Sequence, residues 1–292
     1  MMANYNNENF ITMAIESVLR QTFTDLELIV VDDGSTDDSL TMVKSLAKTD
    51  DRIRILTNGR NAGFPFSVNK AMKAASGRYL TTLDSDDLFR PERLERMVDA
   101  LKGRPDHIAY TDVFRIDKDG KVIRGSFLGS KRSPPEGDAY PYFLKEWMWG
   151  IGTVMFPASA IEAIGYFDES LNWGGDLDYV LRLTEKYRVV LVPEALYGYR
   201  EHESSMTSLT SMRTKGLAIC SILESNLKRK WNDLDDMTKY RTIRRIQNIA
   251  KESKIERKYF AWWVNPTFMR IAAKRLVKNH VRANRAETAS GA

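Results

Sequence analysis

The sequence contains only one cysteine, Cys220, among its 292 residues. A single thiol cannot form a disulfide within the chain, so no internal disulfide stabilises the fold. Chains that do without disulfides are typical of reducing compartments, and we therefore expect a cytoplasmic protein.

Long apolar segments are also missing. No run approaches the ~18 apolar residues of a membrane-spanning helix. The N-terminal segment Met1-Met2-Ala3-Asn4-Tyr5-Asn6 has neither the basic nor the apolar region of a signal peptide. We therefore expect neither a membrane span nor a secretory leader.

Charge is divided unevenly along the chain. Residues 211–292 hold 19 Lys and Arg against 7 Asp and Glu, whereas the whole chain has a net charge of +5. Residues 1–210 are thus net acidic, and the pI near 9.1 reflects the C-terminal segment. Because the basic charge is confined to that segment, it does not indicate nucleic-acid binding, and we expect no nucleic-acid partner.

Helix and strand patterns alternate over residues 10–101. Apolar residues at helical spacing predict a first helix over 10–21 and further helices that follow each strand. Strands are predicted at residues 27–31, 53–56 and 79–83. This alternation with short links predicts an α/β fold with a mostly parallel sheet covered on both faces.

The pattern changes after residue 105. Lys118-Asp119-Gly120 lies between two apolar runs and predicts a hairpin, and residues 125–142 are rich in Gly, Pro and Ser and predict a mobile loop. Further elements are predicted at 153–156 (strand), 176–186 (helix), 189–192 (strand) and from Met206 onward (helical). We divide the chain into residues 1–105 and 106–205, two halves of one domain, and a basic helical extension, 206–292.

Two acidic clusters stand where buried strands should end. The first is Val31-Asp32-Asp33-Gly34-Ser35, and the second is Leu83-Asp84-Ser85-Asp86-Asp87. Bunched carboxylates repel one another and are best tolerated around a cation. Ligands of open α/β sheets bind beyond the carboxyl ends of the strands, so the clusters predict a site for a divalent metal and a charged, polyhydroxylated ligand.

The order of these motifs resembles that of the family 2 glycosyltransferases of GT-A fold. The match covers roughly residues 2–205. It rests on motifs that are weak singly but strong in this order: Asn4-Tyr5-Asn6, the two acidic clusters, Asn61-Ala62-Gly63, Asn69 and Gly175-Asp176-Leu177-Asp178.

The resemblance implies inverting transfer of a sugar from a nucleotide-diphosphate donor, most often UDP-linked, to a glycan or lipid-linked acceptor at the cell surface. It implies that Asp33 binds the base, Asp84 lies near the ribose, and Asp86 ligates Mn²⁺ or Mg²⁺. A divalent ion would stabilise the charge that develops on the diphosphate. Asp176 would be the general base that takes the proton of the acceptor hydroxyl. Tyr5 and Asn61 would also belong to the donor site.

His202 and three tryptophans are further candidates for the site. His202, in Tyr199-Arg200-Glu201-His202, matches a histidine that many GT-A enzymes place beside the metal, although an isolated histidine is more often structural. Trp173 could stack on a sugar ring of the acceptor, and Trp147 and Trp149 could stack on sugar rings too, although all three could equally be core or lid residues. The acidic residues also have purely structural alternatives, as turn or helix-cap groups.

The basic C-terminal segment mixes aromatic residues with Lys and Arg at 258–263 and 269–285. Such a segment can lie on an anionic membrane surface, which predicts a peripheral position at the inner face of the membrane. The alternative is a helical extension whose charges are merely solvated, since Pro266 interrupts the pattern.

The chain departs from the family in three places. Only Met1-Met2-Ala3 stands where relatives have a longer first strand, so we expect neighbouring strands to lose their partner, and either the natural start to lie upstream or the chain to be truncated. Val68 replaces a common arginine, and Gly175 replaces the usual glutamate before Asp176.

Three other functions compete with this interpretation. A sugar nucleotidyltransferase would need a Gly-rich first loop with Arg and Thr, which Asn4-Tyr5-Asn6-Asn7-Glu8 does not supply. An aspartyl-phosphate phosphatase would need its aspartates after the first strand. A degenerate donor-binding scaffold without turnover stays open.

Overall fold

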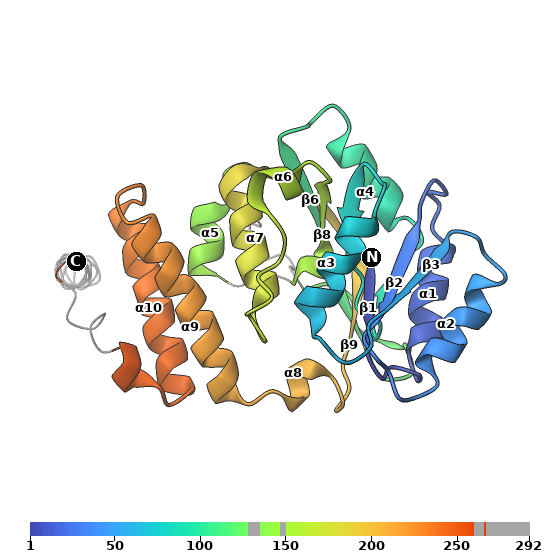
Figure 1. Cartoon of the computed structure of the whole chain (residues 1–292). Helices are drawn as coiled ribbons and strands as arrows, with labels where there is room; N and C mark the ends of the chain where they lie inside the picture. The colour runs from blue at the N-terminus through green and yellow to red at the C-terminus, as the bar shows by residue number, and fades with distance from the viewer. Residues whose placement is uncertain (128–134, 147–149, 260–265, 267–292) are drawn as a thin grey trace, which may run out of the picture. The chain divides into compact units, whose positions relative to one another are not determined.

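The structure is a computed structural model, and it describes residues 1–127, 135–146, 150–259 and 266. Strand β1 (Met2–Asn4), β2 (Leu28–Asp32) and β3 (Ile53–Thr57) form a parallel sheet in that order. Helices α1 (Ile11–Leu19) and α2 (Ser39–Ala47) connect them (Figure 1). The strand–helix alternation predicted from the sequence is confirmed here.

Helices cover both faces of this sheet because its strands are apolar on both sides. On one face Ile11 and Ile15 of α1 join Leu28 and Val30 in the main hydrophobic core. On the other face Ile29 and Val31 pack with Ala71 of α3 (Phe64–Ala74). All five residues of β2 are buried, as expected for a strand in a covered parallel sheet.

The first strand is short but paired. Met2, Ala3 and Asn4 lie opposite Val30, Val31 and Asp32, and the carbonyl of Met1 accepts a hydrogen bond from Leu83 N at 3.0 Å. The expectation that neighbouring strands would lack a partner is therefore wrong, because residues 1–4 supply backbone groups to both sides.

The second sheet is mixed rather than parallel. Its order is β4-β8-β6-β9-β5, with β7 added to β6, and β8 runs antiparallel to both of its neighbours, whereas β6 and β9 are parallel. The predicted hairpin is confirmed as the antiparallel pair β6–β7. The strands are β4 (Tyr79–Thr81), β5 (Leu88–Phe89), β6 (His107–Ile116), β7 (Val122–Arg124), β8 (Val154–Pro157) and β9 (Arg188–Arg200).

Strand β9 is much longer than the predicted 189–192. Its pairing with β6 moves from Thr111↔Val192 to Asp112↔Ala195, which leaves Pro193 in a bulge. Proline lacks the N–H that a ladder needs and is accommodated at bulges. The strand therefore continues past the proline to Arg200, which the sequence pattern did not reveal.

Helices also alternate along the chain with the strands of the second sheet. They are α4 (Arg93–Leu101), α6 (Ala160–Ile164), α7 (Gly175–Lys186) and α8 (Met206–Leu209), with a 3₁₀ turn η2 (Ile151–Thr153). Helix α5 (Tyr140–Lys145) begins inside the predicted mobile loop 125–142, which is wrong for its last residues; residues 128–134 of that loop lie outside the described residues. The Gly and Pro content of residues 125–142 favoured a loop prediction, so the helix that begins at Tyr140 was not predicted.

The chain divides into two compact units, and the second consists of Pro141–Trp147 and the residues from Thr210 onward. Within it, α9 (Met212–Arg229) and α10 (Asp236–Glu252) are followed by η3 (Glu256–Tyr259), and Ser211 and Asp235 cap the two helices through Thr214 N and Thr238 N. The buried side chains between the helices are Cys220, Leu223, Leu227, Ile243, Ile246 and Ala250. The expected C-terminal helices are thus present.

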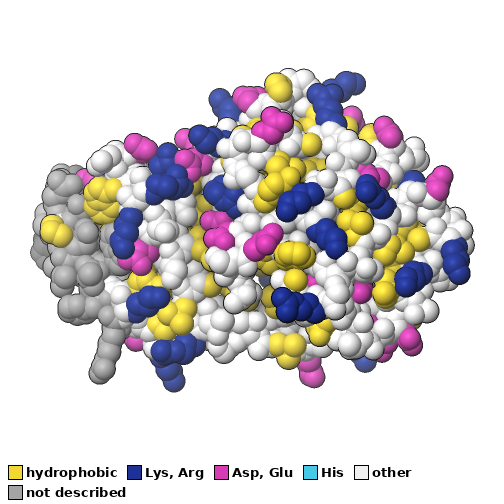
Figure 2. All heavy atoms as spheres, in the orientation of Figure 1, with side chains coloured by type: hydrophobic (Ala, Val, Ile, Leu, Met, Phe, Trp, Pro, Cys, Tyr) yellow, Lys and Arg dark blue, Asp and Glu magenta, His cyan; other side chains and the backbone are white. Residues whose placement is uncertain are grey.

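None of the helices in the described part of the chain is both long enough and apolar enough to cross a membrane. Basic and acidic side chains lie interspersed over the face shown in Figure 2. That view shows several Lys and Arg side chains of α9 and α10 with acidic groups among them.

Candidate active site

The ends of β1, β2 and β4 meet at one edge of the fold, where both acidic clusters lie. Asn4 Nδ2 donates to Asp32 Oδ1 at 3.0 Å, and Asn7 Nδ2 donates to Ser85 Oγ at 2.6 Å. The loop after β1 therefore contacts both clusters. The sequence argument that two strand ends would present their carboxylates together is correct in this respect.

Asp33 holds the loop that precedes α3. Its carboxylate accepts hydrogen bonds from Asn58 Nδ2 (2.8 Å), Ala62 N (2.9 Å) and Gly63 N (2.8 Å). Asn61 is exposed, and its side chain accepts from Gly63 N at 3.1 Å. Asp33 is 3% exposed, so this buried carboxylate is satisfied by main-chain and amide donors and fixes the 58–63 loop.

Asp32 and the neighbouring asparagines shape the turn after β2. Asp32 Oδ2 accepts from Ser35 N at 3.1 Å, and Asn6 Oδ1 accepts from Thr36 N at 2.8 Å. Tyr5, between these groups, leaves 43% of its surface exposed. Its ring is therefore available to a ligand at this edge.

The structure brings Asp86 and His202 together although 116 positions separate them. Asp86 Oδ2 and His202 Nε2 are 3.0 Å apart. The other ring nitrogen, Nδ1, lies 2.9 Å from Ser204 Oγ, and the ring of Phe10 packs against the imidazole with centroids 4.6 Å apart. Histidines that bind metals commonly have their second nitrogen held by a polar partner in this way.

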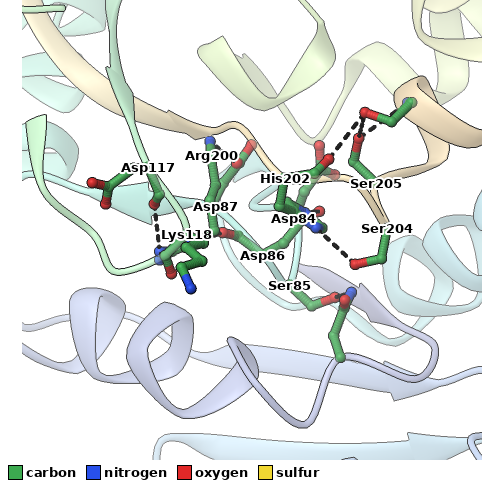
Figure 3. Close-up of polar contacts among 12 residues, drawn as sticks. Asp84, Ser85, Asp86, Asp87, Asp117, Lys118, Arg200, His202, Ser204 and Ser205 are labelled. Atoms are coloured by element: carbon green, nitrogen blue, oxygen red, sulfur yellow. Dashed lines mark hydrogen bonds and ion pairs between the residues drawn. The ribbon is translucent and has the colours of Figure 1, made fainter. Parts of the chain in front are cut away.

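Arg200 holds the backbone of the second acidic cluster. Its Nε donates to the carbonyl of Asp86 at 2.6 Å, and its Nη1 donates to the carbonyls of Asp117 and Lys118 at 3.1 and 2.8 Å (Figure 3). The guanidinium also lies over the ring of Phe10, 4.9 Å from its centroid. Arg200 is 1% exposed, so the positive charge beside the carboxylates is buried.

The remaining carboxylates of the cluster are held close together by Tyr197. Its hydroxyl donates to Asp87 Oδ2 at 2.6 Å and lies 3.5 Å from Asp84 Oδ2, and Arg200 N donates to Asp87 Oδ1 at 2.7 Å. Burial, followed by the charges of Asp86 and Asp176, raises the pKa of Asp84 to about 7. Burial also raises the pKa of Asp87 well above its ordinary value. Burial and crowding thus disfavour the ionised form of both carboxylates.

Asp176 belongs to the same cluster. It lies in the first turn of α7, and Oδ1 accepts from Leu177 N at 2.8 Å. Burial raises the pKa of Asp176, and its charge acts on Asp84. A carboxylate with a raised pKa is a stronger proton acceptor than an ordinary aspartate, as general-base chemistry requires.

Of the three tryptophans expected near sugar rings, the structure describes only Trp173. Trp173 is partly buried and lies directly before Gly174. Gly174 has a φ of 83° and is the N-cap residue of α7. Trp147 and Trp149 lie outside the described residues. Trp173 is thus near Asp176 in sequence and at the same end of α7.

The donor set around Asp86 fits a magnesium or manganese ion. Within residues 1–127, 135–146, 150–259 and 266, no group of three or more His, Cys, Asp or Glu side chains forms a metal cluster. Asp86 and His202 offer one carboxylate oxygen and one imidazole nitrogen. Mg²⁺ and Mn²⁺ accept one or two protein ligands when substrate phosphates complete the shell.

Sequence reasoning missed several residues that shape this site. Tyr197 and Arg200 lie in the last part of β9, which was not predicted as a strand, so their direction toward the acidic loop could not be inferred. Asp87 was seen only as part of the acidic run. The signal that was present is proximity in sequence: Arg200 ends β9, and His202 follows it by two positions.

The comparisons with known proteins agree with this geometry. A profile of the Glycosyl transferase family 2 matches residues 1–158. An uncharacterised glycosyltransferase of Methanocaldococcus jannaschii is 30% identical over 68% of this chain and 69% of its own length. An uncharacterised glycosyltransferase of Haemophilus influenzae is 40% identical over 42% of this chain and 39% of its own length.

Solved structures show the same fold. S. aureus TarS 1-349, crystallised in complex with UDP-GlcNAc, has a TM-score of 0.67 at 21% identity and covers 92% of this chain and 77% of that one. The fold is that of a GT-A glycosyltransferase. The chain belongs to the family 2 glycosyltransferases, and so to the transferase class of enzymes. It spans less than two thirds of the length of several relatives that it matches, including the Haemophilus protein.

Proposed function

We propose that this chain transfers a sugar, with inversion, from a UDP-linked donor to a hydroxyl of a glycan or lipid-linked acceptor. The observation that supports it most is the convergence of Asp84, Asp86 and Asp176 with His202 at the edge where the strands end. UDP-GlcNAc is the first donor to test, because a protein of the same fold was crystallised with it.

The first half of the chain, residues 1–105, binds the donor in this proposal. Asp33 contacts the base, with Tyr5 and Asn61 beside it, and Asp84 lies near the ribose. Asp33 already holds the 58–63 loop through two main-chain amides. The same carboxylate would therefore position both the loop and the base.

Asp86 and His202 would hold Mn²⁺ or Mg²⁺ against the diphosphate. A bound divalent ion stabilises the charge of the leaving nucleoside diphosphate. Ser204 holds His202 Nδ1, which leaves Nε2 directed at Asp86. Arg200 fixes the main chain of Asp86 and keeps the two ligands at this distance.

Residues 106–205 bind the acceptor and contain the base. Asp176 takes the proton of the acceptor hydroxyl while that oxygen attacks the anomeric carbon from the face opposite the diphosphate. The new glycosidic bond forms as the bond from the anomeric carbon to the diphosphate oxygen breaks. Trp173, beside this base, would stack on the acceptor sugar.

The decisive experiment measures nucleoside diphosphate release from a panel of nucleotide sugars with Mn²⁺. Asp86→Ala should lose metal-dependent donor binding, whereas Asp176→Ala should bind donor and turn over far more slowly. Asp178→Ala is the matched control, because Asp178 pairs with Arg182 on the same helix. Donor binding without turnover on any acceptor would favour a scaffold, and no binding to any nucleotide sugar would contradict the proposal.

The basic extension, residues 206–292, would hold the enzyme at an anionic membrane surface. The support is compositional, since its aromatic and basic stretch after Tyr259 lies outside the described residues. Sedimentation of the full chain with anionic and neutral vesicles at low and high salt tests this. Salt-sensitive binding to anionic vesicles alone is expected, and equal binding to neutral vesicles would refute it.

A further inference from the structure

Asn69 lies on α3, outside the acidic cluster, and all of its amide groups are used. Its Nδ2 donates to the carbonyl of Phe167 at 2.9 Å and to Glu169 Oε1 at 2.8 Å. Its Oδ1 accepts from Phe167 N at 2.9 Å. The side chain is 2% exposed, and it pairs with both main-chain groups of Phe167 as a neighbouring strand would.

Phe167, which Asn69 holds, packs directly against α7. It stacks on the ring of Tyr179 with centroids 4.0 Å apart and planes 1° apart, and Phe64 meets it edge-on at 5.9 Å. Tyr179 is three residues beyond Asp176 on α7 and is completely buried. The position of the first turn of α7 therefore depends on where Asn69 holds Phe167.

A second contact joins the beginnings of the two helices. Gly175, the first residue of α7, faces α3: a Cβ built on it would lie 3.5 Å from Pro65 Cγ and 3.8 Å from Phe167 Cδ1. Helix α3 itself is preceded by its N-cap residue Gly63, whose N–H donates to Asp33. One helix thus connects the loop held by Asp33 with the turn that carries Asp176.

We propose that Asn69 is a positioning residue that sets Asp176 relative to the bound donor. This inference rests on the proposed role of Asp176 as base. Asn69 touches neither donor nor acceptor in this account; it acts through Phe167 and Tyr179. A base displaced by about 1 Å can lose on the order of 10²-fold in rate, whereas the donor contacts of Asp33 and Asp86 lie on other loops.

The test is a double-mutant cycle between Asn69→Ala and Asp176→Asn. With Asp176 present, Asn69→Ala should lower kcat at least about tenfold, change donor Kd less than about threefold, and shift the acidic limb of the kcat–pH profile. In the Asp176→Asn background the same change should have little further effect, because the group that it positions is gone. An equal loss of kcat in both backgrounds would overturn the inference.

Two controls separate this role from general destabilisation. Asn226→Ala removes a comparably buried asparagine, which donates to Ile222 O at 2.9 Å in the second unit, and should leave kcat unchanged. Glu169→Ala removes one of the three bonds of Asn69 and keeps those to Phe167. It should give a smaller loss of kcat, and it replaces Asn69→Ala in the cycle if that variant does not fold.

Different results would contradict the role of Asp176 as base and the role of Asn69 as positioning residue. If Asp176→Asn alone keeps wild-type turnover, the proposed base is wrong, whatever the Asn69 variants do. If Asp176→Asn is inactive and Asn69→Ala keeps wild-type kcat and an unshifted pH profile, the positioning role is wrong. A parallel loss of donor affinity and kcat in Asn69→Ala would also overturn it, because that pattern reports disruption of the whole site.

Discussion

Arg200 donates from Nε to the main-chain oxygen of Asp86 at 2.6 Å, so a buried guanidinium fixes the backbone of the proposed metal ligand rather than its carboxylate. The carboxylate of Asp86 stays directed at His202, 3.0 Å away. A contact to the backbone restrains the loop without neutralising the ligand, which a salt bridge to the carboxylate would do.

Arg200→Lys should destabilise the fold and weaken Mn²⁺ binding. One ammonium cannot reach the three carbonyls that the buried guanidinium bonds, and a lost hydrogen bond to a charged group costs about 1.5–3 kcal/mol. We expect about tenfold weaker Mn²⁺ binding in the presence of UDP, measured by calorimetry. Arg115→Lys, on the same sheet and paired with Glu201, is the control and should bind Mn²⁺ normally. Unchanged affinity in Arg200→Lys would contradict the prediction.

Ser204→Ala should weaken Mn²⁺ binding without unfolding the protein. The hydroxyl lies 2.9 Å from His202 Nδ1, and losing the partner of the second nitrogen typically reduces metal affinity about 10–100-fold. Titration of Mn²⁺ with UDP present measures the loss. Ser208→Ala, which removes a nearby hydroxyl that donates to the carbonyl of His202 rather than to its ring, serves as the comparison. Equal affinities in the two variants would refute the orienting role.

The pH dependence of turnover should follow Asp176. Burial raises the pKa of Asp176, and only the carboxylate can accept the proton, so kcat should rise with pH through that raised pKa and then level off. Asp176→Glu should retain part of this profile, whereas Asp176→Asn should lose the acidic limb together with most of the activity. A profile in Asp176→Asn that matches the wild-type enzyme would count against the base.

The raised pKa of Asp176 also affects stability. Turnover should increase with pH, whereas the contribution of Asp176 to stability should decrease. The folded chain binds a proton at Asp176 more tightly than the unfolded chain, so this group contributes less to stability as pH rises through its folded pKa. Without donor and metal, Asp176→Asn should therefore gain Tm relative to wild type as pH increases. Thermal unfolding at several pH values measures this, and a gain that shrinks with rising pH would contradict it.

Gly152→Ala should disturb Tyr197. A Cβ at Gly152 would lie 2.6 Å from the ring and hydroxyl of Tyr197, and overpacking of this kind costs about 1–3 kcal/mol. The displaced ring would lose its bond to Asp87, so activity should fall together with stability in urea unfolding. Gly59→Ala, where the added Cβ meets nothing within 4 Å, is the control. Equal stabilities of the two variants would show that the ring can move freely.

Cys220 should report on the second unit. The thiol is completely buried between α9 and α10, and burial raises its pKa to about 12, so the native protein should not react with a thiol reagent at pH 8. One equivalent should react in denaturant. Rapid reaction of the native protein would mean that α9 and α10 separate readily.

The two acidic clusters were easier to predict from the sequence than the rest of the candidate site. Apolar runs ending in Asp33 and Asp86 are local signals, and the strands that carry them formed where predicted. His202 and Asp86 are far apart in sequence, and only a motif resemblance suggested their proximity. The positions of Tyr197 and Arg200 depend on strand β9, and the hydrogen bonds between Asn69 and Phe167 are a tertiary contact. Local periodicity does not encode contacts between distant segments.

Strands β6 and β9 lie side by side over ten paired positions, although residues 117–187, which contribute β7 and β8 to the same sheet, separate them in the chain. Both ends of this segment are fixed by strand pairing, and its interior is tied to α3 at Asn69. Loop stretches between these anchors can change length without altering strand register. Under the proposed function, length changes there would alter the acceptor side and leave the residues proposed to bind the donor in place.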